Sequence, residues 1–159
     1  MTIFALDIDD CIFLNNNTWC CKMNDNMEIL EINLKRLQKL LNNYDAKVFI
    51  TSSWSTILKL ENNNIIYDNE GYGLPGKSYY DEEYKAFKLL EKYLNSYVIG
   101  LSEGNRFTDI RTLLEDNHKV IAIDDMDLSE IAHDNFLFLK INGLIQNIDL
   151  YKIYKFIEN

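Results

Sequence analysis

Short apolar segments alternate with amphipathic segments along most of the chain. Several apolar segments are rich in β-formers and end abruptly in polar residues, which is typical of buried parallel strands whose carboxyl ends open into a site. Between them, apolar residues recur at spacings of three and four, which predicts helices. The alternation predicts a single α/β domain over residues 1–159 with a mostly parallel sheet. The expected strands are residues 2–6, 46–50, 97–101, 119–123 and 136–141, and the expected helices are residues 25–43, 81–95, 106–116 and 150–157, with short helices starting at Ser55 and after Asp127.

Two stretches depart from this alternation. Residues 12–22 place an asparagine run between two apolar arms, which predicts a hairpin or flap beside the end of the first strand. Residues 61–77 lose their periodicity and hold three of the six glycines and the only proline, which predicts a long loop. Loops of this length in a compact domain are often functional, so residues 61–77 are a candidate specificity loop.

Composition narrows the class of protein. The chain is 47% hydrophobic and 26% charged, the proportions of a soluble globular domain, and no apolar run approaches membrane-spanning length. We therefore expect a cytoplasmic protein with no membrane partner. The net charge of -9 argues against a broad nucleic-acid-binding surface, which needs cations to displace counterions from phosphates. Three cysteines without a C-x-x-C spacing predict neither a disulfide framework nor a zinc site.

Polar residues directly after the strands carry the candidate chemistry. Asp7 and Asp9 follow the first strand, and on a continuing strand both side chains would project to the same side. Two such carboxylates repel unless a cation or a shared proton holds them. Mg²⁺, which prefers hard oxygen ligands, is the obvious cation. The alternative is an acidic turn without chemistry, because Asp is a common turn and cap residue.

The other strand ends supply groups that complement an anion or a cation. Thr51, Ser52 and the following serine either donate to an anion where the sheet opens or cap the next helix, and the two uses are compatible. Arg106 falls in the first turn of a helix, where the dipole disfavours a cation. It therefore either has another partner or lies on the surface. Asp124 and Asp125 repeat the pattern of an apolar run followed by acids.

The order Asp-x-Asp, Thr-Ser-Ser, a basic residue and Asp-Asp resembles the haloacid dehalogenase superfamily of aspartate-nucleophile phosphatases, over residues 4–127. Finer phrases resemble the small capless phosphatase domain fused in bacterial and phage RNA-repair proteins, which is similar in turn to the phosphatase half of polynucleotide kinase-phosphatases. These phrases are LDID at 6–9, ITSSW at 50–54, IG at 99–100 with GNR at 104–106, IDD at 123–125 and NGL at 142–144. The departures are Asp10 for a small residue, Cys11 for Thr or Val, Ser55 for a basic residue and Arg106 for Lys.

The resemblance implies both a fold and a reaction. The fold is a three-layer α/β/α sandwich with a Rossmann-like sheet and no large cap domain. The reaction is Mg²⁺-dependent hydrolysis of a phosphomonoester, with Asp7 as the nucleophile that forms an aspartyl-phosphate and Asp9 as the acid and base. The substrate is a nucleotide or polynucleotide terminus, or alternatively a small phosphorylated metabolite. The implied binding residues are Thr51, Ser52 and Arg106 for the phosphoryl group, Asp7, the Asp9 backbone carbonyl and Asp124 for Mg²⁺, and Asp125 for orienting the groups around the metal.

Two other classes of protein remain open. A receiver-type signalling domain also combines acids, a hydroxyl, a basic residue and magnesium, but it carries its phosphorylated Asp on a middle strand. In this chain the strand expected in the middle ends in residues 51–53, which counts against a receiver. The other alternative is a catalytically silent protein of the same fold, and the competent residues at all four motif positions count against it. The pattern predicts neither the oligomeric state nor a preference for 3′- or 5′-phosphates.

Overall fold

A five-stranded parallel sheet forms the centre of the molecule. The computed structural model describes residues 1–13, 23–68 and 77–159. The strands lie in the order β5-β2-β1-β6-β7, and every neighbouring pair is parallel. The strand in the middle is therefore β1 and not β2, so the expectation that the middle strand ends in residues 51–53 is wrong. The bounds are β1 (Thr2–Leu6), β2 (Lys47–Ile50), β5 (Val98–Leu101), β6 (Lys119–Asp124) and β7 (Phe136–Lys140).

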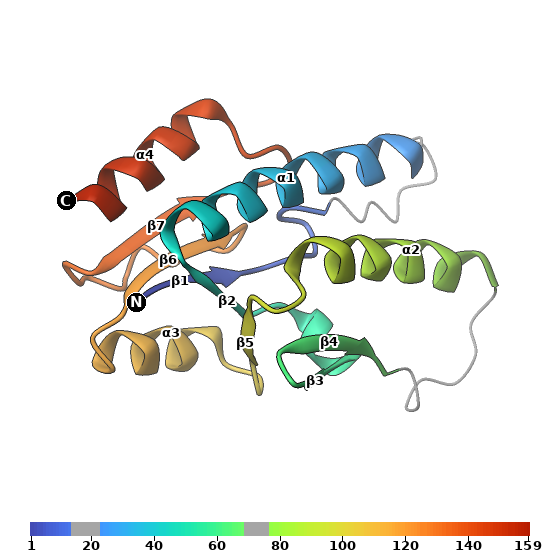
Figure 1. Cartoon of the computed structure of the whole chain (residues 1–159), viewed down its shortest axis with the longest axis horizontal. Helices are drawn as coiled ribbons and strands as arrows, with labels where there is room; N and C mark the ends of the chain where they lie inside the picture. Colours follow the sequence, from blue (N-terminus) through green and yellow to red (C-terminus); the bar gives the residue numbers. More distant parts are fainter. Residues whose placement is uncertain (14–22, 69–76) are drawn as a thin grey trace.

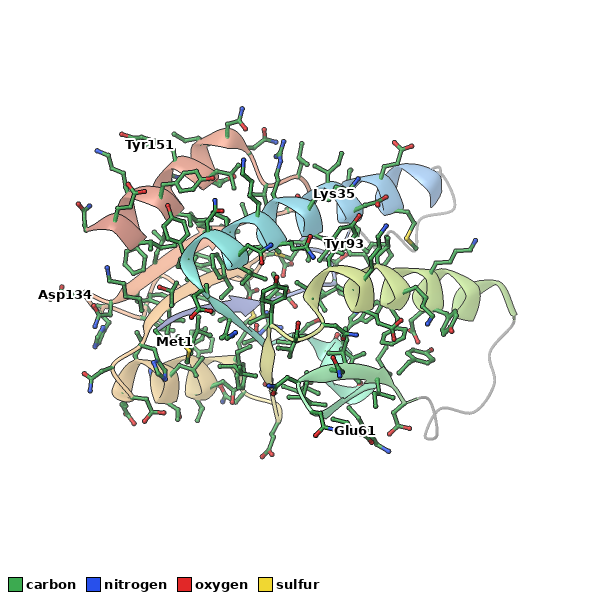
Figure 2. The ribbon with its side chains drawn as sticks, in the orientation of Figure 1. Met1, Lys35, Glu61, Tyr93, Asp134 and Tyr151 are labelled. Atoms are coloured by element: carbon green, nitrogen blue, oxygen red, sulfur yellow. The ribbon has the colours of Figure 1, made fainter. Side chains whose placement is uncertain are left out.

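Helices cover both faces of the sheet, as Figure 1 shows. On one face lie α1 (Met23–Tyr44), α2 (Lys77–Leu94) and α4 (Asn147–Glu158), and on the other lies α3 (Arg106–Glu115). The α/β class and the Rossmann-like three-layer sandwich are thus confirmed, and the part of the chain that the structure describes contains no large cap domain. Figure 2 shows the charged residue Asp134 at the margin of the molecule and Lys35 on α1, and both side chains are exposed.

Alternation along β1 explains the two layers. Ile3 and Ala5 belong to the apolar cluster under α3, whereas Phe4 and Leu6 belong to the cluster under α1, α2 and α4, because successive side chains of a strand point to opposite faces. All four are at most 1% exposed. Full burial of a large apolar side chain contributes about 1.5–3 kcal/mol, so β1 is anchored firmly from both sides.

An antiparallel hairpin replaces the first part of the predicted 61–77 loop. β3 (Leu58–Glu61) pairs with β4 (Asn64–Tyr67). Asn62 and Asn63 form the two-residue turn, with φ angles of 52° and 61°. Asn tolerates this left-handed conformation, and turns of this kind match the twist of hairpin strands. The prediction of an irregular loop is therefore wrong up to the end of β4.

The two predicted short helices also differ from the structure. The helix expected at Ser55 is a single 3₁₀ turn, η1 (Ser53–Thr56), because β3 begins two residues after it. Among the described residues, no helix lies between Asp127 and the start of β7. Instead the Asp127 carboxylate accepts a hydrogen bond from the backbone N–H of Ser129 at 2.9 Å, a local turn that competes with helix formation.

Two predicted segments reach beyond the described residues. The predicted flap at 12–22 is described only through Phe13, which is buried with Ile12. Residues 69–76 of the predicted specificity loop also lie outside the described residues. Among the helices that the structure does describe, none combines the length and the apolar character needed to cross a membrane.

Candidate active site

The strand register brings the ends of three strands to one level. Leu6 pairs with Ile50 on one side and with Ile123 on the other. One residue further, the Asp7 N–H donates to the Ile123 carbonyl at 2.9 Å, and the Thr51 N–H donates to the Leu6 carbonyl at 3.0 Å. The order of the strands reverses at β1, and such switch points are where open α/β sheets bind ligands. The predicted Asp7, Thr51 and Asp124 therefore lie at one edge of the sheet.

Three carboxylates and one guanidinium gather at this edge. Asp7, Asp124 and Asp125 each offer an oxygen within 4.8 Å of the others, and the first two are 3% and 1% exposed. Arg106 donates from Nη1 to both oxygens of Asp124, at 2.6 and 2.7 Å, and lies 3.5 Å from Oδ2 of Asp7. The prediction that Arg106 has another partner is confirmed, and its reading as a surface side chain is wrong.

The charges of this cluster suit a hard divalent cation. When ionised, the three carboxylates carry three negative charges and Arg106 one positive charge, which leaves two negative charges in a mostly buried site. Carboxylate oxygens are the ligands that Mg²⁺ and Ca²⁺ prefer. The donor set therefore fits Mg²⁺, with Asp7 and Asp124 as ligands and Asp125 close enough to orient or to join them.

Burial sets the protonation of Asp7. Removal from water is the largest cause that raises its pKa to about 7, and the nearby Asp124 charge adds to it, while Arg106 opposes the shift. Burial also raises the pKa of Asp124, against the Met126 backbone N–H and Arg106, which stabilise its charge. Without a metal ion, Asp7 is therefore about half protonated near pH 7.

This shift predicts that the metal-free protein loses stability as the pH rises. In the unfolded chain Asp7 has a pKa of about 4, so between about pH 4 and 7 the folded state binds more protons, and each further rise in pH favours unfolding. We expect this group alone to lower the free energy of unfolding by roughly 2–3 kcal/mol between pH 5 and pH 8. Urea unfolding in EDTA measures it. Asp7→Asn should flatten the slope, and an unchanged slope would refute the assignment.

Asp9 faces a different part of the site. β1 ends at Leu6, and the chain then turns, so the two carboxylates do not project together as a continuing strand would place them. The indole Nε1 of Trp54 donates to Oδ1 of Asp9 at 2.6 Å, and the Ser53 hydroxyl donates to Oδ2 at 3.2 Å. Burial raises the pKa of Asp9, and these two hydrogen bonds oppose the shift. Among the described residues, Asp9 is not a side-chain member of the carboxylate cluster.

The three predicted hydroxyls have three different environments. Thr51 Oγ1 is buried and has no hydrogen-bond partner, which is costly unless a ligand or water satisfies it. Ser52 is the N-cap of η1, and its hydroxyl accepts the Trp54 N–H at 3.3 Å, so the capping prediction holds for this residue. Ser53 is exposed and reaches Asp9. Of the three hydroxyls, Thr51 is thus the one that makes no hydrogen bond within the protein.

Comparisons with protein-family models, curated proteins and solved structures find no match for this chain. The side chains at the carboxyl edge of the sheet therefore carry the evidence for its chemistry. These are the carboxylates of Asp7, Asp9, Asp124 and Asp125, the unpartnered hydroxyl of Thr51 and the guanidinium of Arg106.

A buried asparagine that the sequence patterns did not single out holds the turn after Asp9 in place. Asn33 of α1 is fully buried, and its Nδ2 donates to the carbonyls of Ile12 at 3.0 Å and Gly143 at 2.9 Å. Its Oδ1 accepts the Ile145 N–H at 2.9 Å. Gly143, at φ 114°, also donates its N–H to the Cys11 carbonyl at 2.7 Å. The turn after Asp9 is therefore tied to both α1 and the segment after β7.

Ser53, predicted to donate to an anion or to cap a helix, donates to Asp9 instead. Trp54 and Asn33 are the site residues that sequence reasoning missed. Each carried a signal in retrospect. Asn33 interrupts the leucine stripe of α1 at a core position, and Trp54 places a polar N–H directly beyond a buried strand. Buried polar groups of this kind require a partner, although the sequence does not say which.

Proposed function

We propose that this chain is a Mg²⁺-dependent phosphomonoester hydrolase that works through an aspartyl-phosphate on Asp7. The observation that carries the proposal is the pairing of a buried carboxylate with an unpartnered buried hydroxyl. Asp7 and Thr51 follow adjacent strands at the switch point of the sheet, and Arg106 lies 3.5 Å from the Asp7 carboxylate. Phosphoryl transfer needs a nucleophile, donors to the phosphoryl oxygens and a nearby cation.

The reaction has two half-reactions. In the first, a carboxylate oxygen of Asp7 attacks phosphorus, the bond from phosphorus to the ester oxygen breaks, and Asp9 gives its proton to that departing oxygen. In the second, Asp9 takes a proton from water as the water oxygen attacks the same phosphorus. Inorganic phosphate leaves, and both carboxyl groups return to their starting states. The raised pKa of Asp9 supports its use as an acid.

The remaining residues bind the phosphoryl group and the cation. Thr51 donates its free hydroxyl, Arg106 donates N–H groups, and Ser52 is able to donate its hydroxyl proton while its oxygen caps η1. Asp7, Asp124 and the backbone carbonyl of Asp9 would hold Mg²⁺, and Asp125 would orient the surrounding groups. When bound, Mg²⁺ neutralises phosphoryl charge and lets an anionic nucleophile approach. These are the phosphoryl-binding and metal-binding residues that the resemblance to the haloacid dehalogenase superfamily implies.

The favoured substrate is a nucleotide or polynucleotide terminus. No large cap domain occurs among residues 1–13, 23–68 and 77–159, and this supports the choice because an open site admits bulky substrates. The alternative is a small phosphorylated metabolite. The net charge of -9 supports this alternative, because it repels a polyanion at low salt.

A comparison of substrates tests the proposal. With Mg²⁺ present we expect many equivalents of inorganic phosphate from a mononucleotide or from a 3′- or 5′-phosphorylated oligonucleotide, and none in EDTA. The ratio of kcat/KM among the three identifies the substrate class. Failure to release phosphate from any of them, or from a small sugar phosphate, would overturn the proposal.

The same assay separates the enzyme from a receiver-type domain. Asp7 directly follows the middle strand of the sheet, and this position favours the receiver as the second candidate. A receiver holds its phosphoryl group after one transfer, whereas a base beside the intermediate releases it. Release of one equivalent of nucleoside per chain, with the phosphoryl group retained on the protein, would therefore favour the receiver, whereas repeated release of inorganic phosphate favours the hydrolase.

A further inference from the structure

We propose that Trp54 and Ser53 are positioning residues that decide which oxygen of Asp9 carries the proton to the leaving group. The inference rests on the proposed function, since it concerns the acid of that reaction. The inference goes beyond that function because it assigns the two oxygens of the Asp9 carboxyl group to different tasks. The geometry of the contacts carries it.

Each oxygen of Asp9 has its own partner. The Trp54 indole holds Oδ1 at 2.6 Å, which is short for an N–H donor, and the Ser53 hydroxyl holds Oδ2 at 3.2 Å. Both donors belong to η1, directly after β2. The carboxyl group is therefore held at both ends by one turn of the chain, and its plane is set by that turn.

Trp54 is itself fixed to the turn that carries Asp9. Its side chain is buried, and its ring packs edge-on against Phe13, with 6.3 Å between centroids and an interplanar angle of 85°. Phe13 exchanges backbone hydrogen bonds with this turn, since its N–H donates to Ile8 at 2.9 Å and its carbonyl accepts from Asp10 at 2.9 Å. The ring and the indole N–H thus hold the same turn at two points.

The chemistry of the two donors differs in a way that matters for proton transfer. An indole N–H only donates, so Oδ1 must remain an acceptor in both protonation states. The carbonyl oxygen of a carboxylic acid is a better acceptor than its O–H oxygen, so the indole contact favours the proton of neutral Asp9 on Oδ2. A hydroxyl both donates and accepts, so Ser53 stays hydrogen-bonded to Oδ2 whether or not that oxygen carries the proton.

Ser53 also marks the open side of the carboxyl group. It is exposed, whereas Trp54 is buried. A departing ester oxygen reaches Oδ2 from the Ser53 side, and in the second half-reaction the attacking water loses its proton to the same oxygen. General acid catalysis requires such a fixed approach, because the proton must lie within hydrogen-bond reach of the oxygen that receives it.

Trp54→Phe tests the assignment through the leaving group. Phe keeps the ring against Phe13 and removes the N–H. We expect kcat/KM for a mononucleotide, whose leaving group is an alkoxide, to fall about 30-fold, and kcat/KM for 4-nitrophenyl phosphate, whose leaving group departs without a proton, to change by less than about threefold. The ratio kcat/KM reports only the first half-reaction, so slow hydrolysis of the intermediate does not obscure it.

A matched control removes the same kind of contact elsewhere. Tyr93, labelled in Figure 2, donates from its hydroxyl to Glu31 at 2.7 Å where α2 packs on α1. Tyr93→Phe therefore also deletes an aromatic donor to a carboxylate and keeps the ring. We expect this variant to leave both substrates at the wild-type rate.

Ser53→Ala keeps the inference testable if Trp54→Phe fails to fold. Its side chain is exposed, so the variant should fold, and we expect a loss of about fivefold that is again confined to the mononucleotide. An equal loss on both substrates, or no loss with either variant, would overturn the assignment. A wild-type protein that hydrolyses neither substrate would instead overturn the proposed function.

Discussion

Asp7→Asn is expected to lower kcat/KM for a mononucleotide by at least about 10⁴-fold. The amide keeps the size and shape of the carboxylate but is not a nucleophile, so no aspartyl-phosphate forms. Because the substitution also removes a charge that is costly to bury, we expect the metal-free variant to be more stable than wild type at pH 8. Loss of activity together with a gain of stability distinguishes a chemical role from a structural one. Phosphate release and urea unfolding measure the two effects.

Asp10→Asn is the matched control for this substitution. Asp10 is exposed and has a φ of 57°, a conformation that Asn adopts readily. The same change of charge three residues away should therefore leave kcat/KM within about threefold of wild type. If Asp7→Asn kept more than a hundredth of the activity, or if Asp10→Asn lost as much, Asp7 would not be the nucleophile.

Asn33→Leu is expected to lower the free energy of unfolding by about 3–5 kcal/mol. Leucine has the same branching and the same number of side-chain heavy atoms as asparagine, but it satisfies none of the three hydrogen bonds. The carbonyls of Ile12 and Gly143 and the N–H of Ile145 would then lack this partner in the interior. Each buried polar group without a partner costs about 1–3 kcal/mol. The midpoint of urea unfolding reports the change.

The contacts of Asn33 also predict a loss of activity in the variant that remains folded. Ile12 lies in the turn that carries Asp9, so loosening it should disturb the acid more than the nucleophile. Asn43→Leu makes the same chemical change at an exposed position near the end of α1 and should change the free energy of unfolding by no more than about 0.5 kcal/mol. A small effect at Asn33, similar to that at Asn43, would show that the buried hydrogen bonds contribute little.

The sequence predicted those parts of the fold that depend on local periodicity. The five strands of the sheet and the four long helices lie close to their expected positions, because apolar spacing along the chain reports directly on burial. The hairpin of β3 and β4 was missed. Its signal is two asparagines between short apolar strands, and such a turn looks like a polar loop until its partner strand is known. A local turn also takes the place of the helix that was expected after Asp127.

The residues of the site likewise divide into those whose positions the sequence predicted and those whose positions it did not. The positions of Asp7, Thr51 and Asp124 follow from the rule that parallel strands present their carboxyl ends at one edge. The ion pair of Arg106 was foreshadowed by its poor fit to the first turn of a helix. The separation of Asp9 from Asp7 was not predictable, because it depends on where β1 ends and on a partner, Trp54, that is 45 residues away in sequence.

The central place of β1 has a consequence for the chain as it is being made. β1, which Asp7 directly follows, is made before both of its neighbouring strands, and β2 soon covers one of its edges. Its other edge belongs to β6, which begins at Lys119. At about 5–20 residues per second, that edge stays open on the nascent chain for roughly 6–20 s. An open apolar edge is a template for mispairing, so translation speed and chaperone access bear most directly on the strand that carries the proposed nucleophile.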